Sequence, residues 1–469
     1  MSDICINDNL PSMRQSVCGN ISNMNSPLRV PKSILKSIYS HRRFSRSLRV
    51  LGPGLVTGAA DDDPSGIATY SQAGAMYGYK LLWMIPFMYP LLLSVQGACA
   101  RIGAVTGKGL AELIKENYSK KMLYLALFLV IVANVANIGA DFGALASTLQ
   151  LLVPSVPFAV AVIGFAVVML GLELFVPYKK YARMLKWLAV ALFAYPITAF
   201  VVGQPWGQVF AATFNPTNIP FNFTVVMIMV GLFGTTISPY LFFWDTSEVV
   251  EDEITNKRLG LKHLHAPKIT RHFLRNVWID NVLGMTLAAV SAWFIMIVCA
   301  TVLNSHGVTE ISTAADAARA LEPLVQGFPN AGFIAKVVFS IGILGTGLLA
   351  IPVLAGSCSY AISEAFGWKE GLSRKVRKAK GFYIVIILAT LIGLLMNFIG
   401  INPIQALVWA AVINGVAAVP LLTMIARIGV NKKIMGNHTI SFLGRTGIWV
   451  AFIAMALAAV AMLASLFIH

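Results

Sequence analysis

The sequence predicts an all-α polytopic membrane protein with about eleven transmembrane helices. Three observations predict this fold class. Of the 469 residues, 57% are hydrophobic and only 12% are charged, whereas soluble domains carry about 25% charged residues. Apolar runs of about 18 residues or more, long enough to cross a bilayer, recur along the chain. The first and the sixth of these runs each contain a proline and glycines near their centres, where a helix is expected to break.

The predicted spans follow a long polar tail. Residues 1–50 lack the apolar core of a secretory signal and end in a basic run, so we expect a disordered cytoplasmic tail. In chain order, the predicted spans are 51–70, 79–104, 122–152, 156–176, 184–203, 223–244, 278–303, 331–360, 381–400, 403–428 and 446–468.

Loop charges predict the orientation of these spans. Loops 107–121, 369–380 and 427–445 are rich in lysine and arginine, whereas loop 204–222 contains neither. Basic loops stay on the cytoplasmic side of a membrane. We therefore expect a plasma membrane protein, of the bacterial inner-membrane kind, with a cytoplasmic N-terminus and with His469 outside.

Composition excludes several partners. The net charge of +16 would suit a nucleic acid, but the basic residues lie in short loops, so no nucleic-acid partner is expected. The five cysteines form no CxxC pair, which argues against a disulfide framework and a thiolate metal cluster. We expect the lipid bilayer as surroundings and no cofactor. The oligomeric state stays open.

The first span is interrupted by charged residues. It contains three consecutive aspartates and then a proline, at Asp61, Asp62, Asp63 and Pro64. A central aspartate costs about 2.5–3.5 kcal/mol on insertion scales, so such residues normally face a cavity and serve a function. Proline removes a helix hydrogen bond, and a carboxylate beside freed carbonyl groups is the outline of a cation site.

The sixth span is interrupted in a similar way. Its centre holds a glycine pair, three hydroxyl side chains and a proline, at Gly231, Gly234, Thr235, Thr236, Ser238 and Pro239. Transporters built from inverted repeats break corresponding helices in their two halves. We therefore expect a five-plus-five inverted repeat. Its parts are 51–203, then 204–428 with a cytoplasmic loop at 245–277, and then 429–469 as a loop and an extra eleventh helix.

The first two spans carry a series of short motifs, at Gly52–Gly54, Asp63–Gly66, Gln72–Ala75, Gly78–Trp83, Gln96, Ala100–Gly103 and Thr106–Leu113. With these motifs, the two spans resemble those of the Nramp (natural resistance-associated macrophage protein) divalent-metal transporters. The resemblance implies a LeuT-type inverted-repeat fold and a transition-metal site between helices one and six. In that family the ligands are an aspartate and an asparagine on helix one, and a carbonyl and a methionine on helix six. Most members are proton-coupled.

The chain departs from the family pattern at its ligands. Gly66 stands at the family's asparagine, so the amide ligand is missing. On helix six, Thr235 falls at the carbonyl donor and Ser238 at the methionine, while Tyr240 and Asp245 fall at two histidines. On helix three the family carries two acids for proton movement. Here Asp141 keeps one acid and Ile138 replaces the other.

These departures predict a harder metal site. A thioether favours transition metals, whereas carboxylate, carbonyl and water suit hard ions such as Mg²⁺. We therefore favour the Nramp-related magnesium transporter branch, importing Mg²⁺ and Mn²⁺ without obligatory proton coupling. The alternatives are an ordinary proton-coupled Mn²⁺/Fe²⁺ transporter and a sodium-coupled organic solute carrier. An intramembrane aspartyl protease is not expected, because its Gly-x-Gly-Asp context is missing.

Each candidate residue also has a plainer interpretation. Ser and Thr hydroxyls commonly bond to carbonyls of their own helix. Asn137 and Asp141 share a helix face and can form an ordinary interhelical contact. Asn414 can cap a helix irregularity, and the acidic run 245–253 can be a solvated helix face rather than a cation funnel. The predicted metal ligands are Asp63, Thr235, Ser238, Gly66, Asp62 and Asp61, and the predicted supporting or gate residues are Asp141, Asn137, Asn414, Tyr240 and Asp245.

Overall fold

A computed structural model describes residues 57–58, 60–176, 193–216, 222–255, 269–325 and 330–465, and none of these residues forms a β-strand. The tail 1–50 and His469 lie outside the described residues. The longest helices are α4 (Met84–Thr106), α6 (Lys120–Leu152), α7 (Phe158–Phe175), α13 (Arg271–Val302), α15 (Ala331–Phe366), α16 (Lys380–Met396), α17 (Pro403–Val430) and α19 (Phe442–Ser465). The remaining α-helices are α3 (Pro64–Tyr77), α5 (Leu110–Asn117), α9 (Ala194–Val202), α10 (Trp206–Phe214), α11 (Phe223–Thr236), α12 (Pro239–Thr255), α14 (Ala314–Arg319) and α18 (Lys432–Met435).

Polar side chains mark where several of these helices begin. Asp63, Asn222, Thr270 and Asn402 each accept a hydrogen bond from a backbone N–H in the first turn of α3, α11, α13 and α17. Such caps satisfy N–H groups that have no partner inside the helix. α3 and α17 also have proline in the first turn, where the missing N–H is harmless.

In the described part of the chain, eight helices are long and apolar enough to cross a membrane, counting Phe223–Glu251 as one. They correspond to eight of the predicted spans. Of the other three, the span 381–400 is represented by α16, an apolar helix of 17 residues. The span 184–203 lies partly outside the described residues, and the span 51–70 is interrupted before α3.

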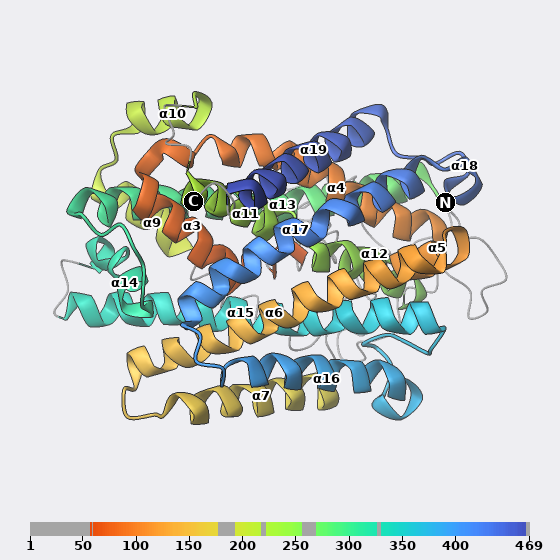
Figure 1. The fold of residues 1–469 in the computed structure, drawn as a ribbon, viewed down its shortest axis with the longest axis horizontal. Helices are drawn as coiled ribbons and strands as arrows, with labels where there is room; N and C mark the ends of the chain where they lie inside the picture. The colour runs from red at the N-terminus through yellow and green to blue at the C-terminus, as the bar shows by residue number, and fades with distance from the viewer. Residues whose placement is uncertain are drawn as a thin grey trace, which may run out of the picture. The chain divides into compact units, whose positions relative to one another are not determined.

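The interrupted helix pair α11–α12 lies in the centre of the bundle. In its apolar window 89% of the residues are buried, against 28% in α7 and in α19, which form the periphery. α11 packs against α17, α17 packs against α6, and α6 packs against α15 (Figure 1). α11 and α17 can approach closely because Gly234 has no side chain. A Cβ at this position would lie 1.9 Å from the Ala411 carbonyl oxygen.

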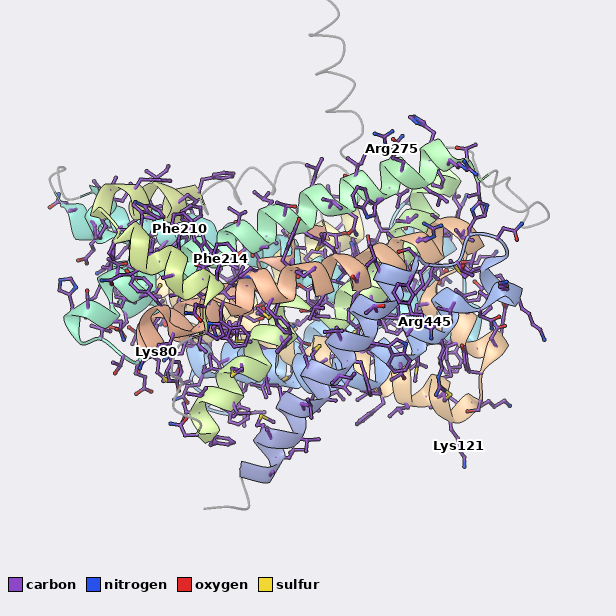
Figure 2. All side chains as sticks on the ribbon, turned by 90° about the horizontal axis from the view of Figure 1, so that it is seen from above. Lys80, Lys121, Phe210, Phe214, Arg275 and Arg445 are labelled. Carbon is purple, nitrogen blue, oxygen red and sulfur yellow. The ribbon has the colours of Figure 1, made fainter. Side chains whose placement is uncertain are left out.

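Basic side chains gather at one end of the bundle. Figure 2 shows Lys121, Arg275 and Arg445 at this end, whereas Lys80 lies at the other end, near Phe210 and Phe214 of α10. We call the first the basic end and the second the lysine-poor end, since loop 204–222 contains no lysine or arginine. The segments around α9, α10 and α14 lie at the lysine-poor end (Figure 1).

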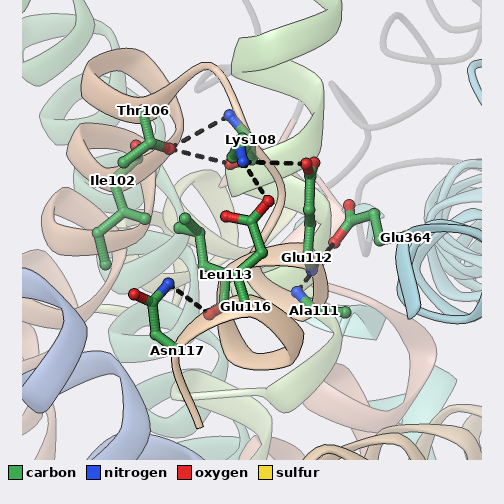
Figure 3. A network of polar contacts seen from close by, with 9 residues as sticks. All are labelled: Ile102, Thr106, Lys108, Ala111, Glu112, Leu113, Glu116, Asn117 and Glu364. Carbon is green, nitrogen blue, oxygen red and sulfur yellow. Dashed lines mark hydrogen bonds and ion pairs between the residues drawn. The ribbon is translucent and has the colours of Figure 1, made fainter. Parts of the chain in front are cut away.

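At the basic end, a buried glutamate holds three helices together. Glu364 of α15 accepts hydrogen bonds from the backbone N–H groups of Ala111 (2.9 Å) and Glu112 (3.3 Å) at the start of α5 (Figure 3). Its other oxygen accepts a bond from the Ser247 hydroxyl of α12 at 2.6 Å. A Cβ at Gly109 would lie 1.8 Å from the Glu364 carboxylate, so a larger residue at this position would displace the glutamate from these bonds.

The acidic run after Asp245 is not a solvated helix face where the structure describes it. Asp245, Glu248 and Glu251 are all buried. Glu251 accepts hydrogen bonds from the N–H groups of Leu372 and Ser373, so it anchors the loop that follows α15. The expectation failed because periodicity in one helix does not show which faces its neighbours cover.

Another carboxyl group in this region, that of Glu370, has a raised pKa. Burial, together with the carboxylates of Glu364, Glu112 and Glu251, raises the pKa of Glu370 to about 9. Glu370 lies in the loop after α15, outside the apolar spans. At pH 7 this side chain is therefore neutral.

Candidate functional site

The first helix break lies at residues 62–63, between helical residues 60–61 and α3. Asp63 caps α3: its Oδ1 atom accepts bonds from the Gly66 N–H (2.7 Å) and from the Ser65 hydroxyl (2.8 Å). Its Oδ2 atom is buried and has no hydrogen-bond partner among the described residues. The cap thus fixes the carboxylate and leaves one oxygen available to a ligand.

The second helix break lies at residues 237–238, between α11 and α12. Pro239 has no N–H, so the carbonyl of Thr235, four residues earlier, lacks its usual helical partner. The Ser238 hydroxyl lies 2.8 Å from this carbonyl and 2.7 Å from that of Gly234. Bonding of the hydroxyl to its own helix is therefore confirmed for Ser238. Its oxygen lone pairs stay available, because the hydroxyl uses only its hydrogen in these bonds.

The two breaks meet, and two tyrosines join them. Tyr240, after the second break, donates a hydrogen bond of 2.9 Å to the carbonyl of Ala60, which Pro64 leaves without a helical partner. Tyr70, after the first break, pairs with the Thr236 hydroxyl at 2.9 Å. A Cβ on Gly66 would lie 3.0 Å from Thr235 Oγ1, so the two segments are in contact there.

All three consecutive aspartates are buried, with at most 3% of each exposed. Asp61 has one carboxylate oxygen with no partner in the described part of the chain. Asp62 instead lies within hydrogen-bonding reach of Ser291 on α13. The three side chains therefore have different surroundings, as their rotation about the chain predicts.

α6 supplies a further carboxylate. Asp141 is fully buried, and it is close enough to Asp63 for the two groups to interact electrostatically. Neither its oxygens nor the amide atoms of Asn137 have a hydrogen-bond partner in the described ranges. The simple interhelical contact is thus not formed. One turn before Asn137, Asn134 donates a hydrogen bond of 3.1 Å to the Leu354 carbonyl, and its amide oxygen has no partner among the residues that the structure describes.

The other two predicted residues lie at different places. Asn414 of α17 is fully buried, and its amide has no partner within the described residues. It lies in the turn of α17 that packs on Gly234, just before the second break. Asp245 bonds to α13 and not to a helix break: its carboxylate accepts a hydrogen bond of 3.1 Å from the Asn281 amide.

Three residues of this region were not among the predicted site residues: Tyr70, Ser291 and Asn134. Each is a polar side chain inside a predicted apolar span. This signal was present, but it does not reveal which helix each side chain contacts. Their roles become visible only in the packed bundle.

The donor set of the site is made of oxygen atoms. Within the described ranges, no three Asp, Glu, His or Cys side chains converge closely enough to hold a metal ion. A cation between the breaks would therefore need hydroxyl, carbonyl or water oxygens in addition to carboxylate. A cavity beside Pro64 has a volume of about 20 Å³, which is room for one water molecule.

Comparisons with known proteins identify the family and the fold of the chain. The family model described as natural resistance-associated macrophage protein-like (Nramp) matches residues 54–465. The divalent metal cation transporter MntH of Clostridium acetobutylicum is 27% identical over 400 residues, covering 84% of this chain and 86% of the relative. The transporter of the same name from Deinococcus radiodurans is 27% identical over 426 residues, covering 87% and 89%.

Solved structures show a similar fold. The Eremococcus coleocola manganese transporter in complex with an aromatic bis-isothiourea compound has a TM-score of 0.68 at 20% identity, covering 94% of this chain and 89% of that chain. MhsT in complex with L-phenylalanine has a TM-score of 0.59 at 14% identity, covering 88% and 98%. The fold is thus that of the LeuT-type transporters, and the family match extends over most of the chain. The chain belongs to the Nramp family.

Proposed function

We propose that this protein transports divalent metal cations, with Mg²⁺ and Mn²⁺ as cargo, through a site between the two helix breaks. One observation carries the proposal: the breaks are in contact, and Asp63 Oδ2 and Thr235 Oγ1 are buried there without a hydrogen-bond partner in the described residues. Buried polar atoms are normally paired. A cation would satisfy both oxygens. The matched relatives are named divalent metal cation transporters, which supports the same cargo class.

The preference for Mg²⁺ follows from the ligands at the second break. Ser238 occupies the position at which the family resemblance places a methionine, so a hard oxygen replaces a soft sulfur. Hard oxygen ligands suit Mg²⁺ and Mn²⁺, and Mg²⁺ keeps several of its waters when bound. The cavity beside Pro64 holds only about one water in this conformation. A hydrated ion that approaches the first break through this cavity therefore requires the cavity to widen during transport.

The membrane arrangement belongs to the same proposal. Eleven spans form two inverted five-helix repeats, 51–203 and 204–428, followed by the loop and helix of 429–469. The two breaks then lie at mid-membrane. The basic end faces the cytoplasm together with the N-terminus, and the C-terminus lies outside, in a membrane of the bacterial inner-membrane kind. Loop charge and the bacterial relatives support this arrangement.

Membrane potential can drive this uptake. A divalent cation gains about 4.6 kcal/mol per 100 mV, twice the value for a single charge. Obligatory coupling to protons is therefore not required. A sodium-coupled organic solute carrier fits less well, since the three buried aspartates at the first break would repel a substrate carboxylate. The likeness to MhsT concerns the fold alone, and membership of a transporter family disfavours the protease alternative.

A second candidate function has its own observation. Asp141 is fully buried beside Asp63, and its two oxygens are unpaired in the described part of the chain. Such a carboxyl group can carry a proton, as the acids on helix three of the family do. This favours an ordinary proton-coupled Mn²⁺/Fe²⁺ transporter as the alternative.

The two functions are separated by uptake into proteoliposomes. One set of vesicles contains a fluorescent Mg²⁺ reporter and a matched set contains a pH dye. We expect Mg²⁺ and Mn²⁺ to enter under an inside-negative potential without acidification of the lumen. Entry of Mn²⁺ but not Mg²⁺, with acidification in step with uptake, would reject the hard-site proposal in favour of the alternative.

A variant of α6 tests the proton role directly. Asp141→Asn keeps the size of the side chain and removes the titratable group. We expect uptake by this variant to keep the pH response of the parent protein. If the pH response disappears while Mn²⁺ uptake continues, α6 carries protons and the coupled function stands.

A further inference from the structure

A short segment at the lysine-poor end is bound to α3 by one glutamine. The segment, residues 308–313, leads into α14 (Figure 1). Gln72 of α3 uses both ends of its amide on it: Nε2 donates to the Thr309 carbonyl at 3.2 Å, and Oε1 accepts from the Ile311 N–H at 3.0 Å. Gln72 is itself only 6% exposed. The amide therefore pairs with the segment as a neighbouring strand would.

Two asparagines hold the same region at its edges. Asn304, at the end of α13, donates to the Ala75 carbonyl of α3 at 2.7 Å. Asn402, at the start of α17, donates to the Ser312 carbonyl at 3.2 Å. The segment thus bridges α3 and α17, and its central bonds are those of Gln72.

Ile311 and Ile404 lie between two cavities, because each of them lines both. The outer cavity, of about 270 Å³, is lined by Ile311 together with Gln72, Met76, Met227, Gln405 and Trp409. The inner cavity, of about 20 Å³, is lined by Ile311 together with Pro64, Ala68 and Ser71. Ile311 is 4% exposed. Its side chain therefore lies between a space large enough for a hydrated ion and the residue next to Asp63.

We propose that Ile311 is the plug, and Gln72 the latch, of the outer gate of this transporter. The apolar side chain excludes water and ions from the route to the first break. Two neutral hydrogen bonds hold the plug, and each contributes little net free energy, so the latch can open during a transport cycle. The proposal rests on transport through the site between the breaks, but it does not depend on which cation is carried.

The latch also connects the gate to the binding site. Gln72 and the cap residue Asp63 belong to the same helix, α3. A change in the position of α3 when Asp63 binds a cation is therefore transmitted to Ile311 through the Gln72 amide. Loop charge assigns the lysine-poor end to the outside of the membrane.

The test measures access from outside in sealed cells, without any metal. Ala68 lines the inner cavity, so Ala68→Cys is labelled with a membrane-impermeant methanethiosulfonate reagent, and the parent chain gives the background. Adding Gln72→Leu removes both latch bonds at nearly constant volume. We expect the labelling rate to rise by about 10-fold or more, the ratio that two lost hydrogen bonds imply. Gln405→Leu makes the same change in the same outer cavity, and we expect it to leave the rate unchanged.

A second variant protects the test against misfolding. Ile311→Ala removes the plug and keeps the latch, and we expect it to raise the labelling rate as well. Monomer yield after size-exclusion chromatography shows whether each variant folds. The proposal is overturned if Gln72→Leu and Ile311→Ala, when folded, label at the parent rate, or if Gln405→Leu raises the rate equally. Because the labelling reports access to a thiol and needs no metal transport, failure of the proposed metal function would leave this result unchanged.

Discussion

The two helix breaks share the same backbone feature, a proline, but they offer different side-chain oxygens. At each break a proline frees the carbonyl four residues earlier, and at each a tyrosine from the same helix reaches across to the other break. The first break contributes buried carboxylates, Asp61 and Asp63. The second contributes only neutral oxygens, from Thr235 and Ser238. Under the proposed function, we expect the first break to supply the charge that attracts a divalent cation and the second break to decide which cation fits.

The largest expected effect removes the charge at the first break. Asp63→Asn keeps an N-cap acceptor for α3, so we expect the fold to lose less than about 1 kcal/mol. Uptake of every divalent cation should fall by about 100-fold, because a charge-assisted interaction of up to about 3 kcal/mol is lost. Isotope or fluorescence uptake measures the rate, and thermal unfolding in detergent provides the control. Near-normal uptake by a folded variant would exclude Asp63 as the central ligand.

The next effect concerns selectivity at the second break. Ser238→Met introduces a thioether, so the uptake ratio of Mn²⁺ or Cd²⁺ to Mg²⁺ should rise by about 10-fold. Competition between the ions in the same vesicles measures this ratio. Ser238→Ala is the control, because it removes the hydroxyl and its bonds to Gly234 and Thr235 without adding sulfur. The comparison between the breaks fails if the two variants have the same ion ratio.

A smaller effect is expected for the bond that joins the breaks. Tyr240→Phe removes the hydroxyl that binds the Ala60 carbonyl. A neutral hydrogen bond contributes about 1 kcal/mol, so uptake should slow by about 5-fold. The ratio between ions should stay constant, since no ligand changes. Tyr70→Phe, which cuts the reciprocal bond, is the matched variant. A change in ion ratio would show that Tyr240 contributes to selectivity.

The smallest effect lies far from both breaks. Glu370 has a pKa of about 9 through burial and its acidic neighbours, so it is neutral at pH 7. Glu370→Gln should therefore leave uptake at pH 7 unchanged. The folded pKa exceeds the ordinary value of 4.5. The carboxyl group of Glu370 thus stabilises the fold fully below pH 4.5, and this contribution is lost as the pH rises toward 9.

The melting temperature of the Glu370→Gln variant, relative to that of the parent protein, should accordingly rise as the pH increases from 5 to 9. Thermal unfolding followed across this pH range measures the difference. A constant difference would mean that Glu370 titrates normally in the folded protein.

Sequence reasoning located the breaks because they depend on local covalent properties. Proline lacks an N–H wherever it lies, so Pro64 and Pro239 each remove one helical hydrogen bond in any packing. The missing bond alone does not break a helix, because Pro90, Pro352 and Pro420 lie inside the continuous helices α4, α15 and α17. Local properties also explain the capping role open to Asp63 and the bonding of Ser238 to its own helix. The interpretation of 245–253 as a solvated face was wrong for Asp245, Glu248 and Glu251, because burial depends on neighbouring helices.

What the sequence by itself determined is therefore the membrane class, the broken helices and the residues offered at each break. Only the tertiary structure decided how these atoms are paired: Asp62 lies beside Ser291, and Asp245 pairs with Asn281. Asp141 and Asp63 lie near each other with oxygens that have no hydrogen-bond partner in the described part of the chain. It also placed Ile311 between two cavities. The physical reason is the separation along the chain over which each effect acts. Proline acts within one helical turn, whereas pairing, burial and closure require side chains that lie tens to hundreds of residues apart to meet.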